Sequence, residues 1–240
     1  MNSETMEDRG TVGQNLNAFQ RVVGVFTSPG RTFADIAQKP SWIIPVVIIA
    51  VVSLVFVFTI RDILVQETLV QQEEKMLERG MESEQIEQAL SRTEWGIRNL
   101  APVTGVVFPL ILLLIVSGIF LFVGNVILGG SATFKKVFSA TSHSWLIFSL
   151  GALILLPIVL SKETMQVTFS LAALMSTESR ETFLYQLLTK IDIFWIWWIA
   201  VQSIGLAAIY QMKTQKMATV VVILYGIYAI IASAITAAFS

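Results

Sequence analysis

The 240-residue chain contains no cysteine and only one histidine, His143. Without thiols it can form neither disulfides nor thiolate metal sites, and a cysteine nucleophile is excluded. A single imidazole argues against a zinc or di-iron centre, so we expect no metal and no cofactor. Only 14% of the residues are charged, whereas a soluble domain carries about 25%. This shortage of charge indicates that lipid is the main solvent of the chain.

The chain also lacks a basic excess, because its net charge is −1. A protein that binds nucleic acid usually carries a strongly basic patch, so we expect no nucleic-acid partner. Residues 1–13 are polar and acidic and contain no apolar core after a basic start, which is unlike a cleaved signal peptide. We expect residues 1–14 to form a flexible tail and the first membrane span to act as the insertion signal.

Long apolar runs are what the chain has in abundance, since 55% of its residues are hydrophobic. About 20 apolar residues, at a rise of about 1.5 Å each, cross the hydrocarbon core of a bilayer. Five runs have about this length, at residues 42–60, 102–128, 145–160, 193–211 and 217–239. The sequence therefore predicts an all-α fold, with a polytopic bundle of five transmembrane helices over residues 41–240.

Residues 15–40 have an amphipathic pattern, with apolar residues at steps of three and four and Ser28-Pro29 at the start of a second helix. Two interpretations are open. The segment could pack on the protein's own spans, or it could lie in the cytoplasmic interface. In the second case Arg21, Arg31 and Lys39 would face anionic headgroups.

Residues 62–100 form the main hydrophilic insert, which is rich in glutamate and divided by Gly80. We predict a helix–turn–helix arm outside the membrane and interpret it as structural rather than as a binding site. Its glutamates lack the loop spacing that hard cations require. Residues 161–192 are mixed in polarity, and we expect an interfacial helix of about 13–15 residues there, too short to span.

Orientation follows from two short loops that contain lysine and no acid. Lys135 and Lys136 lie in one loop, and Lys213 and Lys216 lie in the other. Cytoplasmic loops carry the excess of lysine and arginine. We therefore expect the N-terminus in the cytoplasm and both the arm and the C-terminus outside.

No Asp, Glu, Lys or Arg lies within the five predicted spans. Ionisable residues in the membrane usually mark coupled transport, so their lack argues against proton-coupled or ion-coupled transport. Four milder polar residues are candidate intramembrane contacts: Asn125, Gln202, Ser203 and Tyr225. They could form interhelical hydrogen bonds, or they could contact a lipid headgroup or a substrate.

The run Thr141-Ser142-His143-Ser144 places a histidine beside hydroxyl groups. Sequence neighbours do not face each other on a helix, and no nearby carboxylate could orient the ring as a catalytic triad requires. We expect a capping or interfacial role for His143, and no enzyme activity.

Two segments share a Thr-Phe pair beside a cation, and each precedes a span. They are Gly30-Arg31-Thr32-Phe33 and Ala132-Thr133-Phe134-Lys135. We interpret both as interfacial anchors. Phe33 and Phe134 would enter the acyl boundary, and Arg31 and Lys135 would meet phosphates.

The chain resembles the prokaryotic members of the Yip1-domain membrane proteins. The resemblance lies in Ser28-Pro29 with Phe33 and Ile36, in Lys39-Pro40, and in Gly129-Gly130, Thr133-Phe134-Lys135 and Val137-Phe138. It implies a five-span bundle with a cytoplasmic N-terminus, here in a bacterial cytoplasmic membrane. Eukaryotic relatives are associated with vesicle trafficking and bind prenylated small GTPases. The acidic arm departs from their layout.

Two functions are consistent with these features. The first is a non-enzymatic membrane scaffold with a lipid-organising or trafficking-like role, whose partners are membrane lipids, a membrane protein or a second copy of the chain. The second is a transporter or scramblase for a lipid or small amphiphile. Convergence of Asn125, Gln202 and Tyr225 on one cavity would favour the second.

Overall fold

The computed structural model describes residues 15–167, 169–176 and 179–239, so the tail predicted for residues 1–14 lies outside the described part. The described chain is helical, as predicted, with one isolated bridge between Ser170 and Asp192. Its helices are α1 (Ala18–Thr27), α2 (Pro29–Gln38), α3 (Ile43–Glu78), α4 (Ser83–Phe122), α5 (Phe134–Ser144), α6 (Leu146–Lys162), α7 (Phe183–Thr189), α8 (Ile193–Tyr210) and α9 (Thr214–Phe239). A π-helix, Val123–Ile127, extends α4, and a 3₁₀ turn, Leu171–Leu174, precedes α7.

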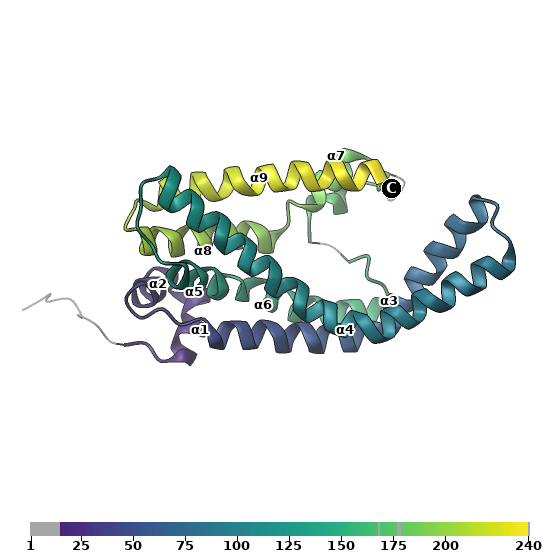
Figure 1. The fold of residues 1–240 in the computed structure, drawn as a ribbon, viewed down its shortest axis with the longest axis horizontal. Helices are drawn as coiled ribbons and strands as arrows, with labels where there is room; N and C mark the ends of the chain where they lie inside the picture. Colours follow the sequence, from purple (N-terminus) through teal and green to yellow (C-terminus); the bar gives the residue numbers. More distant parts are fainter. Residues whose placement is uncertain (1–14, 168, 177–178, 240) are drawn as a thin grey trace, which may run out of the picture.

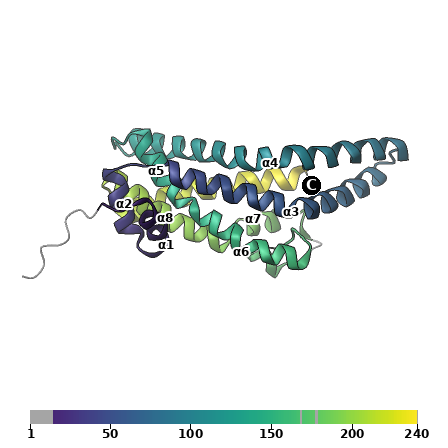
Figure 2. The same ribbon diagram turned by 90° about the horizontal axis from the view of Figure 1, so that it is seen from below.

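Five helical segments are long and apolar enough to cross a membrane, which confirms the predicted bundle. They are Ile43–Glu78, Ser83–Ile127, Phe134–Lys162, Ile193–Tyr210 and Thr214–Ala238. Figures 1 and 2 show them running roughly along one common axis. The third segment is composite, because α5 and α6 are separate helices that meet at Trp145.

The acidic insert is a helical hairpin, as predicted, and it extends beyond one end of the bundle (Figure 1). The structure differs from the prediction in one respect, because the two spans run into the hairpin without a break. α3 continues to Glu78, and α4 begins at Ser83. Gly80 makes the turn with a φ of +70°, a conformation that glycine adopts without strain. Good helix formers occupy the positions where each span leaves the membrane, so neither α3 nor α4 ends at the membrane surface.

The expected interfacial helix within residues 161–192 is wrong. After the end of α6 at Lys162, the described part of this segment contains only the 3₁₀ turn and the seven-residue α7 as helical elements. Thr182 caps α7 by accepting a hydrogen bond from the amide of Tyr185. The segment is held by polar contacts to other elements. The backbone N–H of Met165 donates to Glu67 of α3 over 3.1 Å, and the Tyr225 hydroxyl of α9 donates to the carbonyl of Lys190 over 2.6 Å.

The opposite end of the bundle, which we call the amino-terminal end, consists of α1, α2 and α5, the parts of α4 and α8 against which they lie, and the start of α9, which packs on α8 (Figures 1 and 2). The main hydrophobic core lies here. Phe33 and Ile36 of α2 and Val137 of α5 have no exposed surface, and they pack with Val201 and Leu206 of α8. Residues 15–40 therefore pack on the protein's own spans, which is the first of the two interpretations.

Tyr210, the last residue of α8, is packed between two glycines of the α4–α5 connection. A Cβ on Gly124 would lie 2.1 Å from Cζ of the Tyr210 ring, and one on Gly130 would lie 2.5 Å from its Cδ1. The Tyr210 hydroxyl donates a hydrogen bond to the carbonyl of Phe120 over 3.2 Å. The glycines are thus required for close approach, and they fix how α4 meets α8.

Candidate functional site at the amino-terminal end

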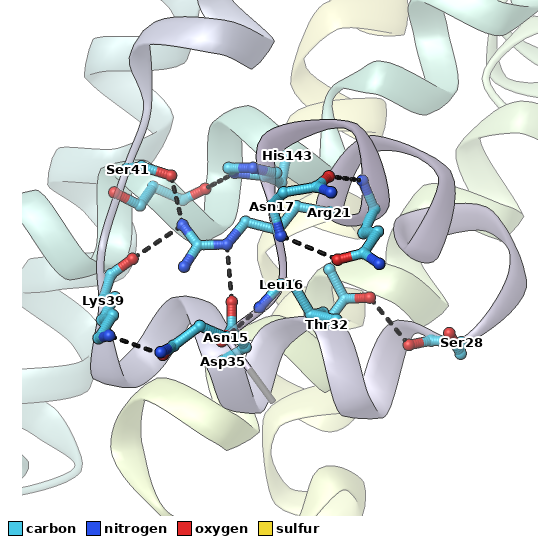
Figure 3. Close-up of polar contacts among 12 residues, drawn as sticks. Asn15, Leu16, Asn17, Arg21, Ser28, Thr32, Asp35, Lys39, Ser41 and His143 are labelled. Atoms are coloured by element: carbon cyan, nitrogen blue, oxygen red, sulfur yellow. Dashed lines mark hydrogen bonds and ion pairs between the residues drawn. The ribbon is translucent and has the colours of Figure 1, made fainter. Parts of the chain in front are cut away.

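A buried arginine organises the amino-terminal end of the bundle. Arg21 of α1 donates from Nε to Asp35 Oδ2 of α2 over 2.7 Å. Its Nη1 donates to the carbonyl of Lys39 over 2.9 Å and to the Ser41 hydroxyl over 2.6 Å (Figure 3). Only 7% of Arg21 is exposed. The guanidinium therefore joins α1, α2 and the start of the first span, and it does not face headgroups as the interfacial interpretation required.

The local sequence explains why α1 and α2 can pack so closely. Gly24 of α1 lies against Thr32 of α2, where a Cβ would come within 2.2 Å of the threonine hydroxyl. Pro29 occupies the first turn of α2, as the Ser28-Pro29 pair predicts. The backbone N–H of Leu16 donates to the other oxygen of Asp35 over 3.3 Å, so this carboxylate also holds the residues before α1.

The polar run at the end of α5 is buried rather than interfacial. Every residue from Val137 to Ser144 is buried, and its hydroxyls donate mainly to carbonyls of the same helix. Gln202 of α8 has no exposed surface and faces this run. Its Nε2 donates to the Thr141 hydroxyl over 3.2 Å, and its Oε1 accepts a hydrogen bond from the Ser144 hydroxyl. Gln202 therefore forms the interhelical hydrogen bonds that were one of its two predicted roles.

His143 is 1% exposed, so the expected capping or interfacial role is wrong. Its Nδ1 lies 2.7 Å from the carbonyl of Ser139, and because a carbonyl can only accept, Nδ1 carries the proton. Figure 3 shows the ring beside Arg21. Within the described residues no carboxylate forms a hydrogen bond with this ring. His143 and the serines beside it are therefore buried, and His143 packs where α5 meets α1.

The other three candidate polar residues lie elsewhere and do not converge. Asn125, in the π-helix, exchanges two hydrogen bonds with the backbone of Ala132, at 2.9 and 3.0 Å. Ser203 donates to the carbonyl of Ile199 in its own helix over 2.5 Å. Tyr225 lies toward the arm end, on α9, where it donates to Lys190. Each satisfies a backbone group near itself, so the predicted polar set does not form one site.

The two predicted anchor segments differ from each other. Phe33 is fully buried, and a Cβ on Gly205 of α8 would lie 3.1 Å from its ring. The prediction that Phe33 enters the acyl boundary is therefore wrong. Phe134 is 41% exposed and stacks on Phe138 at a centroid distance of 5.6 Å. Arg31 and Lys135 are exposed.

Sequence reasoning missed the Arg21–Asp35 pair and the packing of Tyr210. The available signals were weak. Arg21 lies on the amphipathic helix among apolar residues, and Gly124 and Gly130 mark a close approach whose partner, Tyr210, is distant in sequence. In the described residues no group of three or more His, Cys, Asp and Glu side chains is placed to hold a metal.

Five apolar spans, a buried polar end and a projecting arm define a polytopic integral membrane protein of the helical-bundle class. The chain belongs to the Yip1 domain family, whose model matches residues 23–236 and so covers nearly the whole chain. The matched range includes the residues that carry the resemblance noted in the sequence. Comparison with curated proteins and with solved structures gives no match.

Proposed function

We propose that this protein is a non-enzymatic membrane scaffold of the Yip1 type, which organises lipids or a protein partner around a closed bundle. The observation that supports this proposal is the use of the intramembrane polar groups. Gln202, Asn125, Ser203 and Tyr225 each bond to a neighbouring helix or backbone group, at separate places. A carrier needs polar groups that face a shared path, whereas a scaffold needs them for packing.

The grooves along the spans support the same conclusion. One of 480 Å³ lies between α3 and α4 beside Gly105, and one of 500 Å³ lies where α3, α4 and α5 meet. Neither is lined by any of the four polar candidates. No observation on the described residues therefore favours the transporter or scramblase alternative.

Lipid scrambling provides the direct test. The purified full chain would be reconstituted into vesicles that contain a fluorescent phospholipid, and an impermeant reductant would be added outside. We expect about half of the fluorescence to persist, as in protein-free vesicles. Loss of nearly all the fluorescence would establish lipid transport and refute the scaffold proposal, and a smaller loss with Gln202→Ala would assign that transport to the chain.

A scaffold must also hold a neighbour, which crosslinking can detect. A photoreactive residue would replace Trp95 on the arm, which is 62% exposed, or Phe108 in the second span, which is 61% exposed. In intact membranes we expect only lipid adducts from position 108, whereas a discrete protein adduct from position 95 would show that the arm, interpreted above as structural, contacts a partner. A scaffold without any protein adduct at either position would have to act on lipid alone.

We further propose that the amino-terminal end faces the cytoplasm of a bacterial cell. Lys135, Lys136, Lys213 and Lys216 all lie at this end, together with α1 and α2, and the arm lies at the other (Figure 1). This distribution supports a positive-inside orientation. Single cysteines in the cysteine-free chain should react with an impermeant thiol reagent in intact cells at position 74 and not at position 135; the reverse pattern would overturn the orientation.

A further inference from the structure

A lateral groove of 500 Å³ opens near the amino-terminal end of the bundle. It is lined by six apolar side chains and Lys135, and the apolar ones are Trp42, Val46, Leu110, Leu114, Phe134 and Phe138. Aromatic contacts hold one wall in place. The Trp42 and Phe138 rings meet edge to face at 5.5 Å, and Phe134 stacks on Phe138. The groove is therefore built from the first two spans and from α5, between residues distant in sequence.

The surroundings of the groove indicate what kind of molecule enters it. Ile43 and Val47 on α3 and Ile111 and Ile115 on α4 are exposed apolar residues on the same two spans. Because those spans cross the membrane, their exposed apolar faces contact lipid. A groove between such faces is accessible to hydrocarbon rather than to a water-soluble ligand. Its apolar lining matches an acyl chain.

One end of the groove carries positive charge. Lys135 lines it, and Lys136 is its neighbour at the start of α5. No acidic residue occurs between Gly129 and Ser161. Among residues 15–167, 169–176 and 179–239, neither lysine forms an ion pair. Trp42, an aromatic type enriched at membrane interfaces, also lines the groove and directly precedes α3.

We propose that this groove binds an anionic phospholipid, with one acyl chain against Val46, Leu110 and Leu114 and the headgroup at Lys135. The proposal deepens the lipid-organising role proposed above and rests on it. The headgroup must carry a net negative charge, because a zwitterionic headgroup would place its own cation near Lys135 and Lys136, where the like charges repel. A lysine near an anionic lipid surface contributes a factor of about five in binding.

Native mass spectrometry of the purified full chain in detergent tests the headgroup. Phosphatidylglycerol and phosphatidylcholine with identical acyl chains would be titrated separately, and the bound fraction of each would be measured. We expect Lys135→Gln to weaken phosphatidylglycerol binding about five-fold and to leave phosphatidylcholine binding unchanged. Lys213→Gln is the matched control, since it removes an exposed lysine at the same end that does not line the groove.

A second pair of variants tests the acyl chain. Leu114→Trp would fill the groove and should weaken the binding of both lipids, whereas Ile115→Trp adds the same ring to the neighbouring position, which does not line the groove. Unchanged melting temperatures would establish that each variant is folded. If Leu114→Trp does not fold, Lys135→Gln still tests the proposal, because a change at this exposed position leaves the fold intact.

Three results would overturn the proposal. These are equal binding of the two lipids, equal effects of Lys135→Gln and Lys213→Gln, and no effect of Leu114→Trp in a folded variant. The outcome is separable from that of the scaffold proposal, because binding in detergent does not depend on movement of lipid between leaflets. Scrambling activity in vesicles with intact binding at this groove would refute the scaffold alone.

Discussion

Replacing Phe33 by alanine is expected to lower the free energy of unfolding by about 3–5 kcal/mol, the usual cost of emptying a buried phenylalanine site. The ring is fully buried and packs against Gly205 of α8. α2 cannot easily move toward α8 to close the resulting cavity, because the ion pair between Arg21 and Asp35 fixes the position of α2 on α1. Phe134→Ala is the matched control, with a partly exposed ring in the equivalent Thr-Phe motif. It should cost about 1 kcal/mol.

Denaturant unfolding of the two variants in the same detergent measures this difference. Lys135→Gln, at an exposed position beside Phe134, serves as a baseline for surface changes. Equal losses from Phe33→Ala and Phe134→Ala would contradict the packing described for α2, and would instead favour two equivalent lipid anchors.

Removing Arg21 should be as damaging as removing Phe33, and the chain contains its own control. Arg21–Asp35 and Arg98–Asp62 are both ion pairs at 2.7 Å, but their side chains are 8% and 13% exposed in the first pair and 39% and 72% in the second. Breaking a buried pair from one side leaves an uncompensated charge and costs about 3–5 kcal/mol. Breaking an exposed pair costs about 0–1 kcal/mol.

Arg21→Gln and Arg98→Gln, measured by the same denaturant titration, should therefore differ by several kcal/mol. Asp35→Asn should behave like Arg21→Gln, since it orphans the guanidinium. The double variant Arg21→Met with Asp35→Leu should recover part of the loss, because replacing both members of a buried pair with apolar groups avoids the orphaned charge. Similar stabilities for Arg21→Gln and Arg98→Gln would mean that water reaches Arg21.

The spans could be predicted because the bilayer imposes a length and a composition on each one. The predicted run of residues 193–211 and α8 (Ile193–Tyr210) agree to within one residue at each end. The arm could be predicted for a similar reason, since its residues favour helix and Gly80 favours a turn. Both results depend on local sequence alone.

The packing of the amino-terminal end could not be predicted in the same way. Phe33 and Phe134 have the same local pattern, yet one is buried and the other is exposed, because α2 lies against α8 whereas the start of α5 lies at the groove. Gln202 was expected to need a partner, but Thr141 and Ser144 are about 60 residues away. The burial of Phe33 and the partners of Gln202 depend on which helices pack together, and the local pattern of a single sequence does not predict that packing.

The unbroken passage of α3 and α4 from the bundle into the arm has a mechanical consequence. At 1.5 Å per residue, the 36 residues of α3 extend about 54 Å, well beyond a hydrocarbon core of about 30 Å. α3 has no proline after Pro45 in its first turn, so no built-in kink interrupts it. α4 differs, because Pro102 and Pro109 lie inside it, and proline is a common site of helix kinks. The arm therefore continues one span that has no internal proline and one that has two, and the prolines of α4 lie between Gly80 and the groove residues Leu110 and Leu114.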